Sequence, residues 1–134
     1  MTSPIRYAVV FFIFAGAISK TTLAQSVEKT LRDMAAQVSK NLPMMVNAEV
    51  QATAVAASGN RIMYKYNVLK SKERINTSRL RNDHYENSVN AMCSNPGIVN
   101  LLKQGAVLMY QFYDNRNSLL FEMSITQRDC VAKR

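Results

Sequence analysis

The sequence predicts an α+β domain with a four-stranded antiparallel sheet of two hairpins, an N-terminal helix and one or two middle helices packed on one face, and one disulfide. Apolar residues alternate with polar ones in two pairs of segments, which is the period of a half-buried strand. Before the first pair and between the pairs, apolar residues recur every three or four positions, as in an amphipathic helix. Two cysteines complete the pattern.

The first helix is expected to begin after Ser26, whose hydroxyl can cap it, and to end at Pro43, which cannot continue it. Its apolar positions recur at spacings of three and four. They are Val27, Leu31, Met34, Val38 and Leu42. This helix should therefore lie on the core with its charged side chains outward.

A first hairpin is expected after this helix. Residues 46–56 and 62–68 each alternate apolar and polar side chains, and Ser58-Gly59-Asn60 supplies turn chemistry between them. Alanine forms strands poorly, so a helix over 51–57 is the alternative. The regular alternation favours the strand.

Two middle helices are expected next. Thr77 or Ser78 can cap a helix that runs to about Met92. Pro96 suits the first position of a short third helix, and Gly105 suits a left-handed C-terminal cap.

The last quarter of the chain predicts a second hairpin. Apolar side chains alternate over 106–112 and again over 119–126, with a turn-rich loop at 114–118. Single strands do not alternate with helices in this order of elements, which argues against a parallel doubly wound sheet. We therefore expect one antiparallel sheet.

Residues 1–24 have the three parts of a secretory signal peptide, which leaves 25–134 as a single α+β domain. Arg6 lies in the charged part, an apolar stretch covers 7–18, and Ala24 ends a small-residue cleavage site. The alternative is an uncleaved membrane anchor. About 12 apolar residues span ~18 Å of a bilayer core ~30 Å thick, so we favour cleavage, no stable transmembrane segment afterwards, and a periplasmic or secreted protein.

Cys93 and Cys130 are expected to form a disulfide, because an even number of cysteines in a small exported domain favours pairing. A redox pair is the alternative. It would favour two cysteines separated by only two residues, and these are far apart.

Positive charge is concentrated in one segment of a chain whose net charge is +8. Between positions 61 and 82, Glu73 is the only acidic residue beside seven basic ones. The candidate binding residues are Arg61, Lys65, Lys70, Lys72, Arg74, Arg79 and Arg81. Such a segment can attract an acidic protein or an anionic envelope component, and the alternative is a merely solvated loop.

The sequence contains no recognisable catalytic, metal or cofactor site. His84 lies beside Asp83 and near Glu86, which is the only local cluster suited to acid–base chemistry, and we interpret it as a solvated helix face. Nucleic acid is an unfavoured partner, because Tyr64 and Tyr66 lie on the apolar side of their strand and offer no open stacking platform. Asn76-Thr77-Ser78 matches the N-glycosylation pattern, which has low specificity.

Several short segments carry a resemblance to known proteins. They are Asn41-Leu42-Pro43-Met44-Met45-Val46, Cys93, Leu101-Leu102-Lys103-Gln104-Gly105, residues 110–114 and Asp129-Cys130. In these segments the chain resembles small exported bacterial proteins of uncharacterised function. The resemblance implies a bacterial exported domain and no particular activity.

We therefore expect an exported, non-enzymatic binding protein whose basic surface engages an anionic or acidic partner. Inhibitors, immunity factors and accessory subunits of envelope or secretion assemblies are proteins of this kind. The alternative is a small envelope hydrolase that uses His84.

Overall fold

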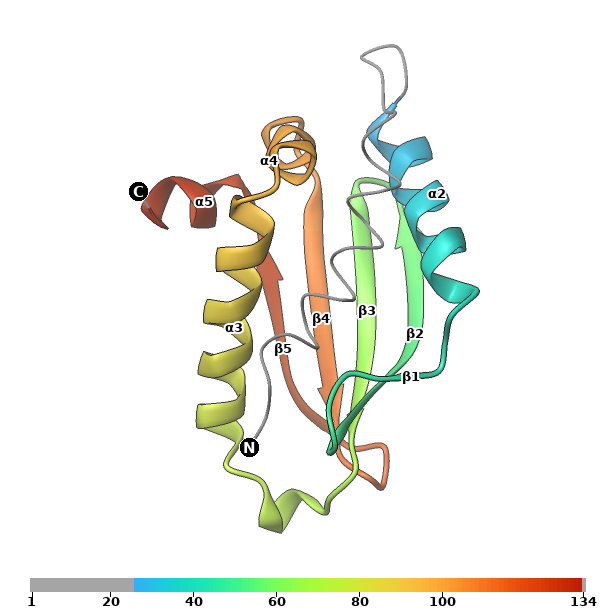
Figure 1. The fold of residues 1–134 in the computed structure, drawn as a ribbon, viewed down its shortest axis with the longest axis vertical. Coiled ribbons are helices and arrows are strands. Elements are labelled where there is room, and N and C mark those ends of the chain that lie inside the picture. Colours follow the sequence, from blue (N-terminus) through green and yellow to red (C-terminus); the bar gives the residue numbers. More distant parts are fainter. Residues whose placement is uncertain (1–25, 134) are drawn as a thin grey trace.

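The computed structural model describes residues 26–133, so the predicted signal peptide lies outside the described residues. Within these residues, five strands and five helical segments follow one another (Figure 1). They are α2 (Val27–Ser39), β1 (Met44–Met45), β2 (Val50–Ser58), β3 (Arg61–Val68), the 3₁₀ helix η1 (Lys72–Arg74), α3 (Thr77–Cys93), α4 (Pro96–Lys103), β4 (Val107–Tyr113), β5 (Leu119–Ile125) and α5 (Gln127–Lys133). The α+β class is confirmed.

The sheet has five strands in the order β1-β2-β3-β4-β5, and it is mixed. Both predicted hairpins are present, because β2 pairs with β3 and β4 pairs with β5 in antiparallel fashion. The expectation of four purely antiparallel strands was wrong in two respects. The short strand β1 is added beside β2, and β3 and β4 run parallel. The connection through α3 and α4 returns the chain to the starting end of the sheet, as a parallel pair requires.

Helices α2 and α3 lie on the same face of the sheet, as the sequence predicted (Figure 1). Helix α2 packs on β2 and β3, whereas α3 packs on β5. Strand side chains that point to this face are buried in the core, among them Ile62, Tyr110 and Ile125. Successive strand residues point to opposite faces, so their neighbours along each strand form the other face of the sheet.

The N-terminal helix begins as predicted and ends earlier than predicted. The Ser26 hydroxyl accepts the backbone N–H of Lys29. The helix ends at Ser39, and the N–H groups of Asn41 and Leu42 close a final turn before Pro43.

The first long strand begins at Val50, four residues after the predicted start. The Asn47 side chain accepts the N–H groups of Glu49 and Val50, which turns the chain at this point. Alternation over 46–49 therefore belongs to a turn, and the alanine-rich segment beyond it is a strand.

Asparagine side chains cap the two middle helices. Asn76, and not Thr77 or Ser78, caps α3 by accepting the N–H of Arg79. Asn95 caps α4, and Gly105 has the positive φ of 99° expected after that helix.

The predicted disulfide is present. It joins Cys93 at the end of α3 to Cys130 in α5, with Cα atoms 5.2 Å apart. Helix α5 was not predicted. Asp129 accepts the N–H of Thr126 at its start and also the hydroxyl of Tyr85 from α3. Within residues 26–133, no helix is both long and apolar enough to cross a membrane.

Candidate functional site

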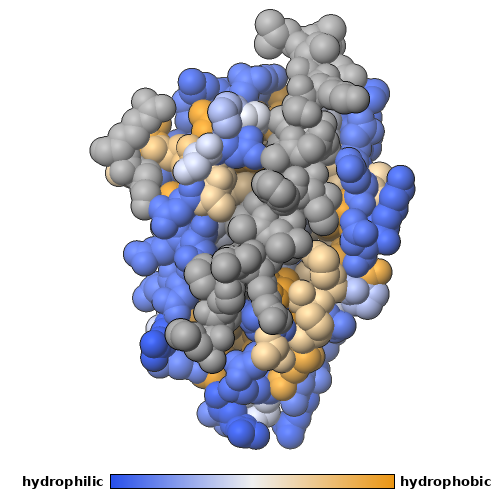
Figure 2. Space-filling view, viewed as in Figure 1, coloured by the Kyte–Doolittle hydropathy of each residue, from blue (hydrophilic) through white to orange (hydrophobic). Residues whose placement is uncertain are grey.

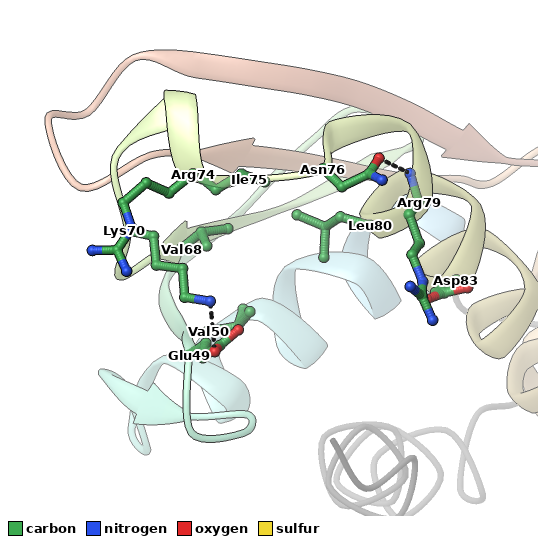
Figure 3. A pocket seen from close by; sticks show the side chains of 10 residues that line it. All are labelled: Glu49, Val50, Val68, Lys70, Arg74, Ile75, Asn76, Arg79, Leu80 and Asp83. Carbon is green, nitrogen blue, oxygen red and sulfur yellow. Dashed lines mark hydrogen bonds and ion pairs between the residues drawn. The ribbon is translucent and has the colours of Figure 1, made fainter. Parts of the chain in front are cut away.

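A pocket of about 490 Å³ lies where β2 begins, β3 ends and α3 begins (Figure 3). Ten residues line it: Glu49, Val50, Val68, Lys70, Arg74, Ile75, Asn76, Arg79, Leu80 and Asp83. Its volume is within the ordinary range of ligand sites. In the space-filling view, hydrophobic residues are visible at this end of the molecule with hydrophilic residues beside them (Figure 2).

The apolar part of the pocket comes from strand ends and from the start of α3. Val50 and Val68 face each other as partners in the β2–β3 pair, and both are almost completely buried. Ile75 and Leu80 are partly buried and pack against the core. These four aliphatic side chains form an apolar floor.

The charged part of the pocket contains two ion pairs of different strength. Lys70 Nζ lies 2.8 Å from Glu49 Oε2, which is a close contact. Arg79 Nε lies 3.9 Å from Asp83 Oδ2, with side chains 80% and 67% exposed. Among the described residues Arg74 forms no ion pair.

The loop that carries Lys70 and Arg74 is fastened to the loop between β4 and β5. Asn115 donates its backbone N–H to the Lys70 carbonyl at 3.0 Å. Asp114 accepts the backbone N–H groups of Ser118 and Arg116, at 2.8 Å and 2.9 Å. The Ser118 N–H in particular holds the pKa of the Asp114 carboxyl below its usual value.

Of the seven basic candidates, three line the pocket, a fourth lies beside it, and three lie on other faces of the molecule. Lys70, Arg74 and Arg79 line the pocket, as described above, while Lys72 is exposed beside it. Arg81 lies two residues after Arg79 in α3 and therefore on the far side of that helix, near Tyr85.

Two further basic residues lie on the sheet face opposite the helices. Lys65 Nζ is 4.6 Å from the centre of the Tyr113 ring. Arg61 borders a hollow of about 390 Å³ with Ala56, Ser58 and Met63. The basic segment of the sequence therefore does not form one continuous stripe, because the strand pleat and the helix distribute it over separate faces.

His84 is buried, with 1% of its surface exposed, so our interpretation of this residue as part of a solvated helix face was wrong. Its ring packs edge-on against Tyr66, Tyr110 and Phe112. Ser88 Oγ lies 3.2 Å from His84 Nε2, one turn further along α3. Burial lowers the pKa of His84 to about 3, so the imidazole is neutral at physiological pH.

The carboxylates that the sequence placed near His84 do not accompany it into the core. Asp83 and Glu86 are exposed on other sides of α3. Within residues 26–133, no three His, Cys, Asp or Glu side chains gather as metal ligands would. The buried spacing of His84, Ser88 and Met92 could have been recognised in the sequence, but two of these positions are polar.

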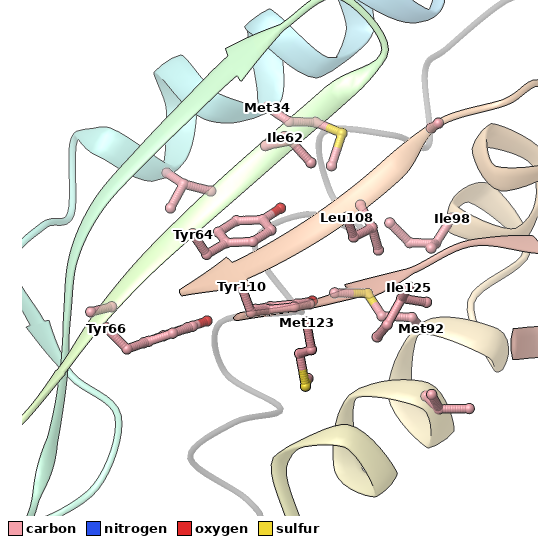
Figure 4. Packing of buried hydrophobic residues seen from close by; sticks show 14 of the residues in the cluster. Met34, Ile62, Tyr64, Tyr66, Met92, Ile98, Leu108, Tyr110, Met123 and Ile125 are labelled. Carbon is pink, nitrogen blue, oxygen red and sulfur yellow. The ribbon is translucent and has the colours of Figure 1, made fainter. Parts of the chain in front are cut away.

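Tyr64 and Tyr66 lie on the buried side of β3, as the sequence predicted. Tyr64 lies beside Tyr110 in the core (Figure 4), and their stacked ring centres are 5.2 Å apart. Tyr66 stacks on Phe112 with ring centres 4.8 Å apart. Burial raises the pKa of Tyr64 and of Tyr110. These rings belong to the core and not to an exposed stacking surface.

The chain is a small α+β domain with helices on one face of a mixed sheet, and its fold is similar to that of two solved pilotins. The EpsS pilotin of the Vibrio vulnificus type 2 secretion system has a TM-score of 0.65 at 18% identity, over 78% of this chain and 91% of that one. The type II secretion system pilotin AspS from Vibrio cholerae has a TM-score of 0.60 at 17% identity, over 78% and 92%.

The chain belongs to the family described as "Putative quorum-sensing-regulated virulence factor", whose model matches residues 20–131. A "putative secreted protein" from Pseudomonas aeruginosa has a similar structure, with a TM-score of 0.58 at 22% identity over 80% of this chain and 98% of that one. No curated protein sequence matches the chain. The similarity to the three solved structures concerns the fold.

Proposed function

We propose that this protein is an exported, non-enzymatic accessory subunit of a bacterial secretion assembly, located in the periplasm or outside the cell. One observation carries the proposal: a fold similar to that of two type II secretion pilotins has a pocket that combines an apolar floor with basic side chains. Its partner is another protein, which it contacts at the pocket and at the adjacent basic residues.

The chemistry of the pocket favours binding over catalysis. Aliphatic side chains form its floor, and ion-paired or solvated charges form its rim. Sites of this composition bind by burying apolar surface and by matching charge. The hydrolase alternative depended on His84, whose imidazole is buried beside Ser88 and is neutral.

Charge should determine how fast the partner is captured. Arg74, Arg79 and Lys72 are exposed at or beside the pocket. Exposed cations raise the encounter rate with an acidic surface, and salt at 0.1 M largely screens this attraction beyond about 10 Å. Binding should therefore be tighter at low salt.

Capture from envelope extract tests the proposal. Tagged protein purified after export is incubated with detergent extract at low and at high salt, and the captured proteins are identified by mass spectrometry. We expect a secretion-assembly component, with less of it at high salt and less with Arg74→Glu and Arg79→Glu together.

Lys103→Glu is the matched control, because it reverses an exposed charge in α4, at the other end of the molecule (Figure 1). Its capture should equal that of the unmodified protein. The proposal fails if no secretion component is captured, or if Lys103→Glu reduces capture as much as the pocket variants.

A further inference from the structure

The pocket at the start of α3 has two chemically different parts, and an occupant must match both. Val50, Val68, Ile75 and Leu80 give it an aliphatic floor. Burying an apolar side chain on such a floor is favourable by about 25 cal/mol for each Å² removed from water. The occupant therefore contains a bulky apolar group.

The rim offers a positive charge at a defined place. The charge of Lys70 is already paired, because its Nζ lies 2.8 Å from Glu49 Oε2. Asp83 holds Arg79 only loosely, at 3.9 Å, and an exposed pair of this kind contributes little stability. Arg74 is exposed and has no ion-pair partner among residues 26–133. Its guanidinium is therefore the group best placed to donate hydrogen bonds to a carboxylate of a ligand.

This combination excludes two other kinds of ligand. A small inorganic anion would be held by the cations alone and would leave the aliphatic floor without a partner. A bilayer surface is broad, whereas the floor is formed by strand ends and the first turns of α3 inside a pocket. A peptide segment can place an apolar side chain in the pocket and a carboxylate at its rim.

The rim is held in place before any ligand binds. The Lys70 carbonyl accepts the Asn115 N–H, and Asn76 caps α3 through the Arg79 N–H. These bonds fix both ends of the segment that carries Arg74. A positioned site loses less conformational entropy on binding than a flexible one.

We propose that this pocket binds a peptide segment of a partner protein in which a bulky apolar residue is next to an acidic one. The apolar side chain lies mainly on the partly exposed Ile75 and Leu80, beneath which Val50 and Val68 are buried, and Arg74 pairs with the carboxylate. The inference rests on the proposed function, because it assigns the chemistry of the partner at the same site.

Titration of ¹⁵N-labelled protein, purified after export, with three short blocked peptides tests the inference. The first has the sequence Ser-Leu-Asp-Leu-Ser, the second replaces the aspartate with asparagine, and the third replaces both leucines with alanine. We expect the first to shift the amide signals of Val50, Val68 and Leu80. The second and third should each bind about tenfold more weakly.

Arg74→Gln should remove the preference for aspartate over asparagine and leave the binding of the asparagine peptide unchanged. Lys103→Gln is the matched control, since Lys103 is an exposed cation of α4 at the other end of the molecule (Figure 1). This control should keep the full preference. Because Arg74 is exposed, its replacement should not unfold the protein.

Three results would overturn the inference: no shifts with millimolar peptide, equal binding of the aspartate and asparagine peptides, or equal shifts with inorganic phosphate alone. Each is distinguishable from failure of the proposed function. A secretion component captured from the envelope extract despite such a result would preserve the accessory role and move its contact elsewhere.

Discussion

His84 Nε2 lies 3.2 Å from Ser88 Oγ inside the core, and this contact fixes an uncharged imidazole among aromatic rings. The folded protein holds this imidazole at a pKa of about 3 because of burial, whereas an unfolded chain has a value near 6.5. Between these pH values the unfolded state binds the extra proton. Stability from this group is therefore complete above about pH 6.5 and is lost as the pH falls toward 3.

We predict that His84→Gln flattens the dependence of stability on pH in this window. For a single such group the free energy of unfolding falls by about 1.4 kcal/mol per pH unit. Urea unfolding at about pH 4, 5, 6 and 7 measures how the free energy of unfolding changes with pH. Equal slopes for the variant and the unmodified protein would show that His84 does not titrate between the two states.

The same residue illustrates what the sequence could predict and what it could not. Alternation identified β3 and β4 and the buried side of Tyr64 and Tyr66, because apolar periodicity reports burial directly. On the buried face of α3 the apolar Val89 and Met92 follow the predicted pattern, whereas His84 and Ser88 escaped prediction because they occupy positions where an apolar residue is expected. Apolar periodicity predicts which face of a helix or strand is buried. It does not predict a polar side chain that is buried in contact with another polar side chain.

The pairing of β3 with β4 and the pocket also could not be predicted from the sequence pattern. Each hairpin could be predicted from its own turn, but nothing local specifies that β3 lies beside β4. Seven basic residues stood out as one charged segment. Only the folded chain shows that Arg61 and Arg74 lie in separate hollows, and that aliphatic residues distant in sequence complete the second one.

The cap of α3 gives a second prediction. Asn76 accepts the N–H of Arg79, so Asn76→Ala should lower the free energy of unfolding by about 1 kcal/mol. Ser78→Ala is the control, because Ser78 is exposed inside the helix and was the cap that the sequence suggested as an alternative. Chemical denaturation of both variants measures the difference. A larger loss of unfolding free energy for Ser78→Ala than for Asn76→Ala would contradict the assignment of Asn76 as the cap.

The disulfide gives a third prediction. Cys93 and Cys130 are separated by 37 positions, and a cross-link of this size stabilises a small domain by roughly 2–5 kcal/mol. Replacing both cysteines with alanine should lower the melting temperature and increase cleavage by proteases.

The unmodified protein with and without reducing agent provides the control, and the double variant should not respond to the reductant. If reduction leaves the melting temperature of the unmodified protein unchanged, the link between α3 and α5 contributes nothing measurable to stability.

Asp114 gives the last prediction, which concerns the loop that supports the pocket. Its carboxylate accepts the N–H groups of Ser118 and Arg116, and these bonds lower its pKa in the folded protein. A lowered carboxyl pKa stabilises the folded state above about pH 4, and the contribution is lost as the pH falls further. Asp114→Ala removes the carboxylate oxygen that accepts both bonds. It should accelerate hydrogen exchange at the amides of residues 116 and 118 and lower the melting temperature at neutral pH.

Asp33→Ala is the matched control, because Asp33 forms an exposed ion pair with Lys29 on α2 and accepts no backbone N–H from residues 26–133. It should leave exchange in the loop unchanged. Since Asn115 of this loop donates to the Lys70 carbonyl, loosening the loop should also reduce the preference of the pocket for an acidic peptide. Unchanged exchange in Asp114→Ala would mean that the loop is held by its other contacts, and the pocket would then keep its preference.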